Sequence, residues 1–366
     1  MQDGVPGRQV KAKEASKLSS KIRVGLIGYG YWGPNYARAL ADLPDLSLTF
    51  VCDTQEEQLR RAAVRFPGVP LSQDVSEAVR RDDVDAVIIS TPASTHYELA
   101  RLALESGRHV IVEKPLALEI EHCEHLGELA EKKGLVLMVA HTFLYNSGIQ
   151  KLREFVKSSN FGRVYYLHAT RTNLGPIRPD VNAVWDLAPH DISIFNYLMD
   201  EQPLWVSAIG SRALGNIRED VAFITLGYSN DVIGNIHVSW ADPNKVREVV
   251  VVGSRQRLVF DDLNSLERVR IYEKGVSVGE THAGSFGEFK LLMRDGDIVS
   301  PRIELSEPLK GQLTDFVEAV IGHRQPLSGS LSGTHVVQAL KAIDISIRER
   351  GAAVEVAKCK VASRSN

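Results

Sequence analysis

A glycine-rich turn near the N-terminus constrains the fold more than any other feature of this chain. The turn, Gly28-Tyr29-Gly30-Tyr31-Trp32-Gly33, follows a short apolar run, Ile22 to Ile27, and precedes a helical pattern from Pro34 to Leu43. Its G-x-G-x-x-G spacing provides a tight turn, a backbone that can approach a pyrophosphate, and a helix packed closely on the strand. The N-terminus of the helix would add unpaired N–H groups and a partial positive charge beside the phosphates. We therefore predict a dinucleotide-binding βαβ unit whose cofactor contacts include Gly28, Gly30 and Gly33.

An aspartate at the end of the next predicted strand bears on which dinucleotide is bound. The strand spans Leu46 to Cys52, and Asp53 follows it, 20 residues after Gly33. A carboxylate at this place hydrogen-bonds the hydroxyls of the adenosine ribose, whereas the 2′-phosphate of NADP would meet a like charge. We expect the cofactor to be NAD rather than NADP.

The same alternation of strand and helix continues to about residue 146. Apolar strands are predicted at Asp85 to Ser90, His109 to Val112 and Leu135 to Ala140, with helices at Ser94 to Ser106 and Leu118 to Lys133. Continuous apolar strands separated by helices indicate a parallel sheet that is covered on both faces. We predict that residues 21–146 form a Rossmann dinucleotide-binding domain of the α/β class.

Beyond residue 147 the pattern changes to consecutive short strands. The predicted strands are Val164 to Thr170, Val206 to Ser211, Val221 to Tyr228, Val232 to Trp240, Glu248 to Val252 and Arg257 to Asp261. The predicted helices are Gly148 to Ser158, Asp186 to Met199, Leu309 to Ile321 and Leu331 to Glu349. Short turns between strands indicate a mostly antiparallel sheet, so residues 147–356 are expected to form an α+β substrate-binding and oligomerisation domain. The last helix is expected to dock on the first domain, and the uncovered face of the sheet to form a homodimer or homotetramer.

Length and composition exclude several classes of protein. A chain of 366 residues suits two domains, and a formal net charge of −3 without a long basic run argues against nucleic-acid binding. No apolar run approaches the ~20 residues of a membrane span, so no membrane partner is expected. Residues 1–20 are polar and lack the apolar core of a secretory signal. We take them as a disordered leader and residues 357–366 as a tail, and we expect a cytoplasmic protein.

The cysteines and the paired histidines give no sign of a disulfide framework or a metal site. Cys52, Cys123 and Cys359 are odd in number and far apart, so we expect three reduced thiols. His122 and His125 lie among glutamates on a polar predicted helix. A solvated helix face is the favoured interpretation, and no metal is expected.

Two stretches carry groups suited to removing a proton and a hydride from an alcohol. Such chemistry needs a base for the proton and a positive group near the oxygen. Glu113-Lys114-Pro115 follows an apolar strand, at the edge where ligands of open α/β sheets bind. Asp186 and His190 are four apart in a predicted helix, so a carboxylate would lie beside an imidazole and orient it. The alternatives are a solvated loop lysine, a helix-capping aspartate and an interfacial histidine.

Together these motifs resemble the glucose–fructose oxidoreductase and inositol dehydrogenase (Gfo/Idh/MocA) family, from Lys21 to about Val356. The markers are the glycine turn, Thr91-Pro92, His96, Glu113-Lys114-Pro115 and the Asp186…His190 pair. The resemblance implies that His190 is the base in oxidation and the acid in reduction. It implies that Lys114 contacts the reacting oxygen and the nicotinamide ribose, that Asp186 orients substrate and histidine, and that the Lys114–Pro115 bond is cis.

The family resemblance also implies further contacts to the cofactor. They are Tyr31, Trp32, Thr91, Pro92, His96, Glu113 and Lys114. For Trp32 we weigh a wall of the nicotinamide pocket against packing in the core, and we favour packing.

Four stretches resemble one branch of the family, the nucleotide-sugar 3-dehydrogenases of polysaccharide and amino-sugar biosynthesis. They are residues 30–35, 141–146, 171–175 and 185–191. This resemblance implies NAD-dependent chemistry at C-3 of a UDP-N-acetylated sugar or its uronic acid. Substrate contacts are expected at Tyr145, Arg171, Asn173, Arg178, Asn182, Trp185 and His190.

The two arginines in this set suit a diphosphate or a carboxylate, and ordinary surface ion pairs are the alternative for both. Three other functions stay open for the chain. One is a polyol or inositol dehydrogenase, another is an NAD-binding regulator without turnover, and the third is redox-neutral hydrolysis through transient oxidation at C-3.

Overall fold

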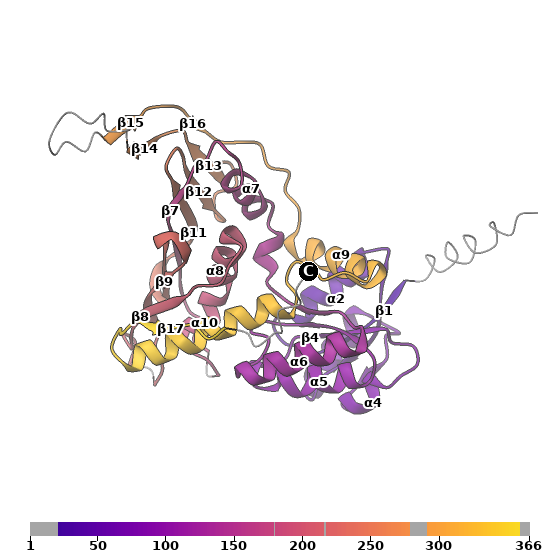
Figure 1. The fold of residues 1–366 in the computed structure, drawn as a ribbon. Helices are drawn as coiled ribbons and strands as arrows, with labels where there is room; N and C mark the ends of the chain where they lie inside the picture. The colour runs from indigo at the N-terminus through magenta and orange to yellow at the C-terminus, as the bar shows by residue number, and fades with distance from the viewer. Residues whose placement is uncertain (1–20, 179, 216, 279–290, 359–366) are drawn as a thin grey trace, which may run out of the picture.

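Two bodies of different architecture make up the chain, one built on a parallel sheet and one on a largely antiparallel sheet (Figure 1). The computed structural model describes residues 21–178, 180–215, 217–278 and 291–358. The expectations for the leader at residues 1–20 and for Cys359 lie outside the described residues.

The first sheet has the strand order β3-β2-β1-β4-β5-β6, with every neighbouring pair parallel. The strands are β1 Ile22–Ile27, β2 Leu46–Cys52, β3 Leu71–Ser72, β4 Ala86–Ile89, β5 His109–Val112 and β6 Leu137–Val139. The order reverses between β1 and β4, and ligands of such sheets bind at the carboxyl ends of the strands beside this point.

Helices cover both faces of the parallel sheet, which explains why its strands are continuously apolar. The side chains of β4, for example, are fully buried from Ala86 to Ile89. The helices are α2 Gly33–Asp42, α3 Glu56–Arg65, α4 Val75–Val79, α5 His96–Glu105 and α6 Ile120–Lys133, with a 3₁₀ turn η2 at Ala93–Thr95. The predicted Rossmann architecture is confirmed.

The second sheet has the strand order β16-β13-β12-β11-β7-β10-β9-β8-β17 in the described part of the chain. All neighbours are antiparallel except β7 and β10, which are parallel. The strands are β7 Val164–Leu174, β8 Trp205–Ser211, β9 Val221–Gly227, β10 Ile233–Ser239, β11 Ala241–Gly253, β12 Arg257–Asp261, β13 Val269–Tyr272, β16 Ile298–Val299 and β17 Val354–Glu355. β14 Gly275–Val278 and β15 Leu291–Arg294 pair separately.

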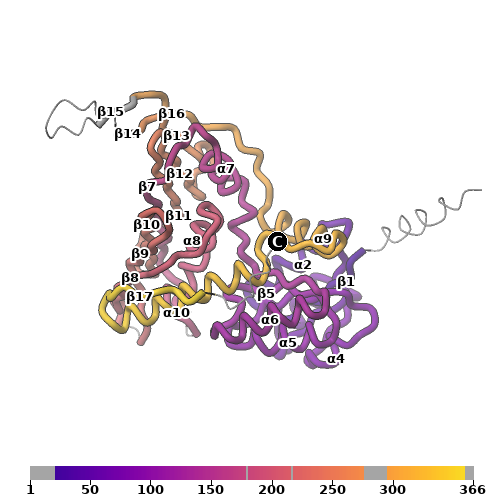
Figure 2. The backbone as a smooth tube through the Cα atoms, in the orientation of Figure 1, coloured from indigo at the N-terminus to yellow at the C-terminus, as the bar shows by residue number. Residues whose placement is uncertain are grey.

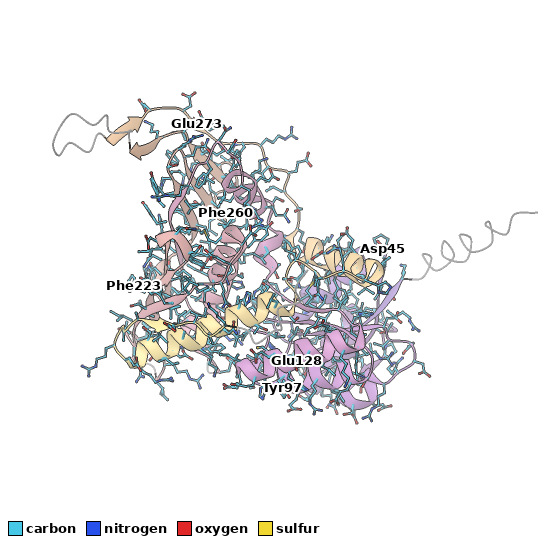
Figure 3. The ribbon with its side chains drawn as sticks, in the orientation of Figure 1. Asp45, Tyr97, Glu128, Phe223, Phe260 and Glu273 are labelled. Carbon is cyan, nitrogen blue, oxygen red and sulfur yellow. The ribbon has the colours of Figure 1, made fainter. Side chains whose placement is uncertain are left out.

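Helices lie on one face of this sheet. They are α7 Ser147–Val156, α8 Ala183–Met199 and part of α10 Ser330–Arg348. The short η4 Ser229–Asp231 forms the turn between β9 and β10, whereas α9 Pro308–Gly322 packs on η3 Thr142–Tyr145 and on α2 of the first domain (Figure 1). A Cβ on Gly234 of β10 would lie 2.7 Å from the Phe195 ring, so α8 packs directly on the strand. On the opposite face Phe223 and Ile209 are 53 % and 62 % exposed. Figure 3 shows Phe223 on the side of the sheet away from α8.

The last long helix, α10, joins the two bodies, as Figure 2 shows. Near its start, a Cβ on Gly333 would lie 2.5 Å from Val139 of the first domain. Near its end, Ser346 Oγ accepts a hydrogen bond from Ala208 N of β8 at 2.8 Å. The expectation that this helix docks on the first domain is confirmed. None of the described helices is long and apolar enough to cross a membrane.

Candidate active site

The glycine turn closes against the end of β4 and leaves its outer side open. Gly28 has a φ of +93°, and a Cβ there would lie 2.7 Å from the carbonyl oxygen of Ser90. A Cβ on Gly33 would lie 2.4 Å from the carbonyl oxygen of Gly28, so α2 begins directly on the turn. A Cβ on Gly30 would meet nothing within 4 Å, which leaves this backbone open to a phosphate. The turn therefore has the shape that the motif predicts.

The residues flanking the turn are a fixed carboxylate and an exposed aromatic pair. Asp53 Oδ2 accepts a hydrogen bond from Tyr29 N at 2.7 Å, and Oδ1 accepts one from Gln55 N at 2.8 Å. Tyr31 and Trp32 are 85 % and 40 % exposed, with ring centroids 5.9 Å apart. The expectation that Trp32 packs in the core is wrong, because its ring lies at the surface against Tyr31.

A buried histidine joins the loops that follow β4 and β5. His96 is 1 % exposed, and its Nδ1 lies 2.7 Å from the carbonyl oxygen of Pro115. Its Nε2 lies 3.0 Å from the carbonyl oxygen of Thr91, which the exposed Pro92 follows. Burial lowers the pKa of His96, and a neutral imidazole donates to one of the two carbonyls at a time. The two loops are thereby held at a fixed distance.

A buried carboxylate fixes the backbone on which Lys114 stands. Glu113 accepts hydrogen bonds from the Tyr36 hydroxyl of α2 at 2.9 Å and from Lys114 N at 3.2 Å. Burial raises the pKa of Glu113, and the positive charge of Lys114 opposes that effect. The bond between Lys114 and Pro115 is cis, as the family resemblance implies.

Lys114 of the first domain and Asp186 of the second meet between the domains. Lys114 Nζ donates to the carbonyl oxygen of Asp186 at 2.7 Å and lies 3.2 Å from Asp186 Oδ1. Arg178 lies 3.3 Å from the same oxygen, and Trp240 Nε1 donates to Oδ2 at 3.2 Å. The side chains of Lys114 and Asp186 are only 9 % and 18 % exposed. Charge-assisted hydrogen bonds in such partly dry surroundings hold both groups in place.

The imidazole of His190 lies one helical turn beyond Asp186 and is partly buried. Burial lowers the pKa of His190 well below its usual value, and the positive charges of Lys114 and Arg171 lower it further. The ring is therefore neutral near pH 7 and able to accept a proton. The centroid of the Phe143 ring lies 5.1 Å from that of the imidazole. His190 Nδ1 is buried and has no hydrogen-bond partner within the described ranges.

The structure does not show the Asp186–His190 hydrogen bond that their spacing predicts. Both side chains are on α8, but the carboxylate oxygens of Asp186 are engaged by Lys114, Arg178 and Trp240. Cationic donors bind a carboxylate more strongly than a neutral imidazole does. Asp186 therefore positions Lys114 rather than the histidine.

Arg171 is part of a buried ion pair, and one edge of its guanidinium is occupied by Asp191. Its Nε and Nη2 donate to the two carboxylate oxygens of Asp191, each at 2.8 Å, and the side chains are 4 % and 1 % exposed. The guanidinium carbon lies 4.3 Å from the centroid of the Phe143 ring. The alternative of a surface pair is wrong for Arg171, because the pair is buried, and the expected substrate contact stays a prediction.

Two family models match this chain. The model of the oxidoreductase family with an NAD-binding Rossmann fold matches residues 22–141, and the model of the Gfo/Idh/MocA C-terminal domain matches residues 149–259. The chain belongs to the Gfo/Idh/MocA family.

Relatives of the chain within this family include a dehydrogenase named for a nucleotide sugar and one named for a polyol. UDP-N-acetylglucosamine 3-dehydrogenase of Acidithiobacillus ferrooxidans is 28 % identical, over 89 % of this chain and 97 % of the relative. A solved structure of that enzyme superimposes with a TM-score of 0.77 at 26 % identity, over 90 % of this chain and 98 % of the other. Myo-inositol 2-dehydrogenase of Thermotoga maritima is 26 % identical, over 69 % of this chain and 79 % of the relative.

Four other residues expected to contact the substrate are held by the protein itself in this Gfo/Idh/MocA member. Asn182 Oδ1 accepts a hydrogen bond from Trp185 N at 3.0 Å and caps α8, which begins at Ala183 rather than at the expected Asp186. The other three donate to protein acceptors: Tyr145 to Asp315 at 2.7 Å, Trp185 to Asp344 at 2.9 Å, and Asn173 to the carbonyl of Gly175. Arg178 donates through Nε and Nη2 to the two carboxylate oxygens of Asp180, at 3.1 and 2.8 Å, and its side chain is 39 % exposed. The structure thus shows the ion-pair alternative for Arg178, and its substrate contact stays a prediction.

Sequence reasoning missed four residues that surround His190 in this family member. Trp240 holds Asp186, and Phe143 packs on the imidazole. Arg247 of β11 lies 6.0 Å from the Phe143 ring, and its charge lowers the pKa of His190. His141 follows β6 and is 1 % exposed. Residues 141–146 carried a family likeness that could have pointed to His141 and Phe143, whereas nothing in the sequence marked Arg247 or Trp240.

The histidines of α6 form an aromatic cluster with α5. The His122 ring stacks on the Tyr97 ring with centroids 3.7 Å apart, and His125 Nδ1 lies 2.9 Å from the Tyr97 hydroxyl. Within the described ranges, no group of three histidine, cysteine, aspartate or glutamate side chains could hold a metal ion. Cys52 and Cys123 are both buried, and burial raises the pKa of the Cys52 thiol to about 11.

Proposed function

We propose that this chain is an NAD-dependent dehydrogenase that oxidises or reduces the C-3 hydroxyl position of a UDP-N-acetylated sugar or its uronic acid. The observation that supports this most directly is that Lys114 Nζ donates to the carbonyl oxygen of Asp186 at 2.7 Å and lies 3.2 Å from its carboxylate, one helical turn before the partly buried His190. An ammonium group and a neutral imidazole, contributed by different domains, are the two groups that alcohol oxidation needs. The likeness to UDP-N-acetylglucosamine 3-dehydrogenase extends over nearly the whole chain and favours a nucleotide sugar.

The residues around the glycine turn fit a nicotinamide dinucleotide. Gly30 leaves room for the pyrophosphate, and the N-terminus of α2 would face it. Both carboxylate oxygens of Asp53 already accept backbone N–H groups, which fixes the carboxylate and leaves further lone pairs for ribose hydroxyls. A fixed negative charge there disfavours a 2′-phosphate, so we propose NAD over NADP.

The chemical step divides between two residues of the chain. When bound, the nicotinamide ring accepts the hydride from the carbon that carries the hydroxyl. His190 takes the hydroxyl proton in the direction of oxidation and returns it in reduction, because its lowered pKa keeps the imidazole neutral near pH 7. Lys114 stabilises the negative charge that develops on the oxygen. Asp186 and Glu113 hold Lys114 from its side chain and its backbone, respectively.

Arg178 is the residue of the predicted substrate set that best suits an anionic substrate. Its Nη1 lies 3.3 Å from Asp186 Oδ1, beside the reacting groups, and its guanidinium is partly exposed. Its Nε and Nη2 donate to Asp180 in this structure, so a substrate anion would take the place of that carboxylate. A guanidinium fork binds a diphosphate or a carboxylate in two places. A nucleotide sugar or a uronic acid offers such a group, whereas inositol does not.

The test is nicotinamide absorbance with purified protein, NAD, and a panel of UDP-N-acetylglucosamine, its uronic acid and myo-inositol. Turnover of the nucleotide sugars is expected, with competition by UDP. Turnover of inositol alone would replace the substrate proposal with a polyol dehydrogenase. Tight NAD binding without turnover on any sugar would support a regulator. Product release without net NADH would support redox-neutral hydrolysis.

Two variants test the roles of the reacting residues. Lys114→Ala and His190→Asn are each expected to lower kcat by about 10²–10⁴-fold, with NAD affinity changed only a few-fold. Matched controls are Lys151→Ala, whose side chain pairs with Glu154 on α7, and His125→Asn on α6. Near-normal rates in both active-site variants would show that the roles are assigned wrongly.

A further inference from the structure

His141 is a buried imidazole whose ring nitrogens the protein does not use. Its backbone is fixed, since His141 N donates to the carbonyl oxygen of Val139 at 2.7 Å and its own carbonyl accepts from Leu144 N at 3.0 Å. The side chain is 1 % exposed, and neither Nδ1 nor Nε2 has a hydrogen-bond partner among the described residues. Buried side-chain nitrogens are nearly always hydrogen bonded. This pair of atoms is therefore arranged for a polar group that the chain does not itself supply.

The position of His141 in the sheet indicates which group that is. Asp53 follows β2 and marks the adenosine side of the sheet, and the glycine turn lies at the reversal between β1 and β4. A dinucleotide laid across this reversal places its nicotinamide half over the ends of β4, β5 and β6. Lys114 follows β5, and His141 follows β6, the next strand. The imidazole thus lies on the nicotinamide side, next to the proposed reacting groups.

Electrostatic coupling places His141 close to those groups. Burial lowers the pKa of His141 to about 3, and the positive charge of Lys114 contributes to the shift. His141 in turn lowers the pKa of His190. The imidazole of His141 is therefore neutral near pH 7 and presents one donor nitrogen and one acceptor nitrogen.

The carboxamide of nicotinamide is the complementary group in this part of a bound dinucleotide. Its NH₂ donates and its oxygen accepts, and neither atom takes part in the reaction. We propose that His141 accepts a hydrogen bond from the carboxamide NH₂ of bound NAD and thereby fixes the rotation of the nicotinamide ring against Lys114 and His190. This assignment rests on the proposed NAD-dependent function of the chain.

A cofactor analogue makes the hydrogen bond testable by binding alone. In 3-acetylpyridine adenine dinucleotide a methyl group replaces the NH₂, while the carbonyl and the rest of the molecule are retained. Titration calorimetry gives the dissociation constants of NAD and the analogue for wild type, His141→Leu and His141→Gln. Wild type is expected to prefer NAD by about 3- to 10-fold, the range of one hydrogen bond. His141→Leu should lose that preference, and His141→Gln, which keeps an acceptor, should retain most of it.

The outcomes distinguish a wrong role for His141 from a failure of the proposed NAD-dependent function. If His141→Leu keeps the wild-type preference for NAD, or if wild type shows none, the role of His141 is refuted. If wild type binds neither dinucleotide, the proposed NAD-dependent function fails instead. His125→Leu, a histidine on the exposed side of α6, should keep the wild-type preference. Circular dichroism of each variant checks that it is folded, and His141→Gln carries the test if the leucine variant is not.

Discussion

The buried pair of Arg171 and Asp191 allows a sharp test of how this site is held together. The pair makes two hydrogen bonds of 2.8 Å, and its side chains are 4 % and 1 % exposed. Arg171→Met would leave the Asp191 carboxylate buried without a cation. Breaking a buried pair in this way costs about 3–5 kcal/mol of unfolding free energy. That loss is a large part of the roughly 5–15 kcal/mol that stabilises a typical domain.

The measurement is urea denaturation at pH 8 of wild type, Arg171→Met, Asp191→Leu and the double variant. The double variant is expected to lie within about 1–2 kcal/mol of wild type, because it buries no unpaired charge. Arg60→Met is the matched control: Arg60 pairs with Glu56 at 3.2 Å, but both side chains are well exposed, so the change should cost under about 1 kcal/mol. A loss below 1 kcal/mol in Arg171→Met, combined with a raised KM for the substrate, would refute the structural role and favour Arg171 as a substrate contact.

Three further predictions follow from individual side chains. Wild type should lose stability as pH falls from about 6.5 towards 3, because the unfolded chain protonates His141 there and the folded one does not. His141→Gln should therefore lose about 2 kcal/mol less than wild type between pH 8 and pH 5, measured by denaturation at both values. Asp53→Ser should raise the preference for NADP over NAD about tenfold, roughly 1.4 kcal/mol, measured as the ratio of kcat/KM values; an unchanged ratio would contradict the role of the carboxylate. The open sheet face around Phe223 and Ile209 is expected to pair with a second copy of the chain, so Phe223→Glu should lower the molecular mass found by analytical ultracentrifugation, and an unchanged mass would exclude this face.

The first domain could be predicted almost completely because its signals are local. The strands are continuous apolar runs, and the glycines of the turn have no substitute at Gly28, where φ is +93°, or at Gly33, where a Cβ would meet the turn. The predicted strands β1, β2 and β5 accordingly match the structure to the residue.

The second domain was predicted in outline, and its errors have local causes. β11 begins at Ala241, seven residues before the expected start, because Asp242-Pro243-Asn244 read as a polar break. The strands β13, β16 and β17 have two to four residues each, which is too short for a period to show. Such short strands exist because neighbouring strands complete their hydrogen bonds, and a single sequence does not reveal those neighbours.

The sequence predicted candidate site residues that follow a strand or are spaced along one helix. It did not predict hydrogen bonds between residues that are far apart in the sequence. Lys114 and His190 could be found from motif spacing. The engagement of Asp186 by Trp240, and of Tyr145 by Asp315 of α9, depends on contacts across 54 and 170 positions of the chain. Helical spacing alone therefore gave the wrong partner for Asp186.

Because α10 contacts both domains, the first domain cannot be separated from the rest of the chain without losing part of its packing. The helix contacts both bodies, with Gly333 packed closely against Val139 and Ser346 hydrogen-bonded to β8. A first domain truncated near residue 146 would lack its contacts with α10, which lies about 190 positions later in the sequence. A chimaera that takes its first domain from another family member would therefore also need residues 330–348 of that member. The unit that folds around the cofactor site is thus not one continuous stretch of the sequence.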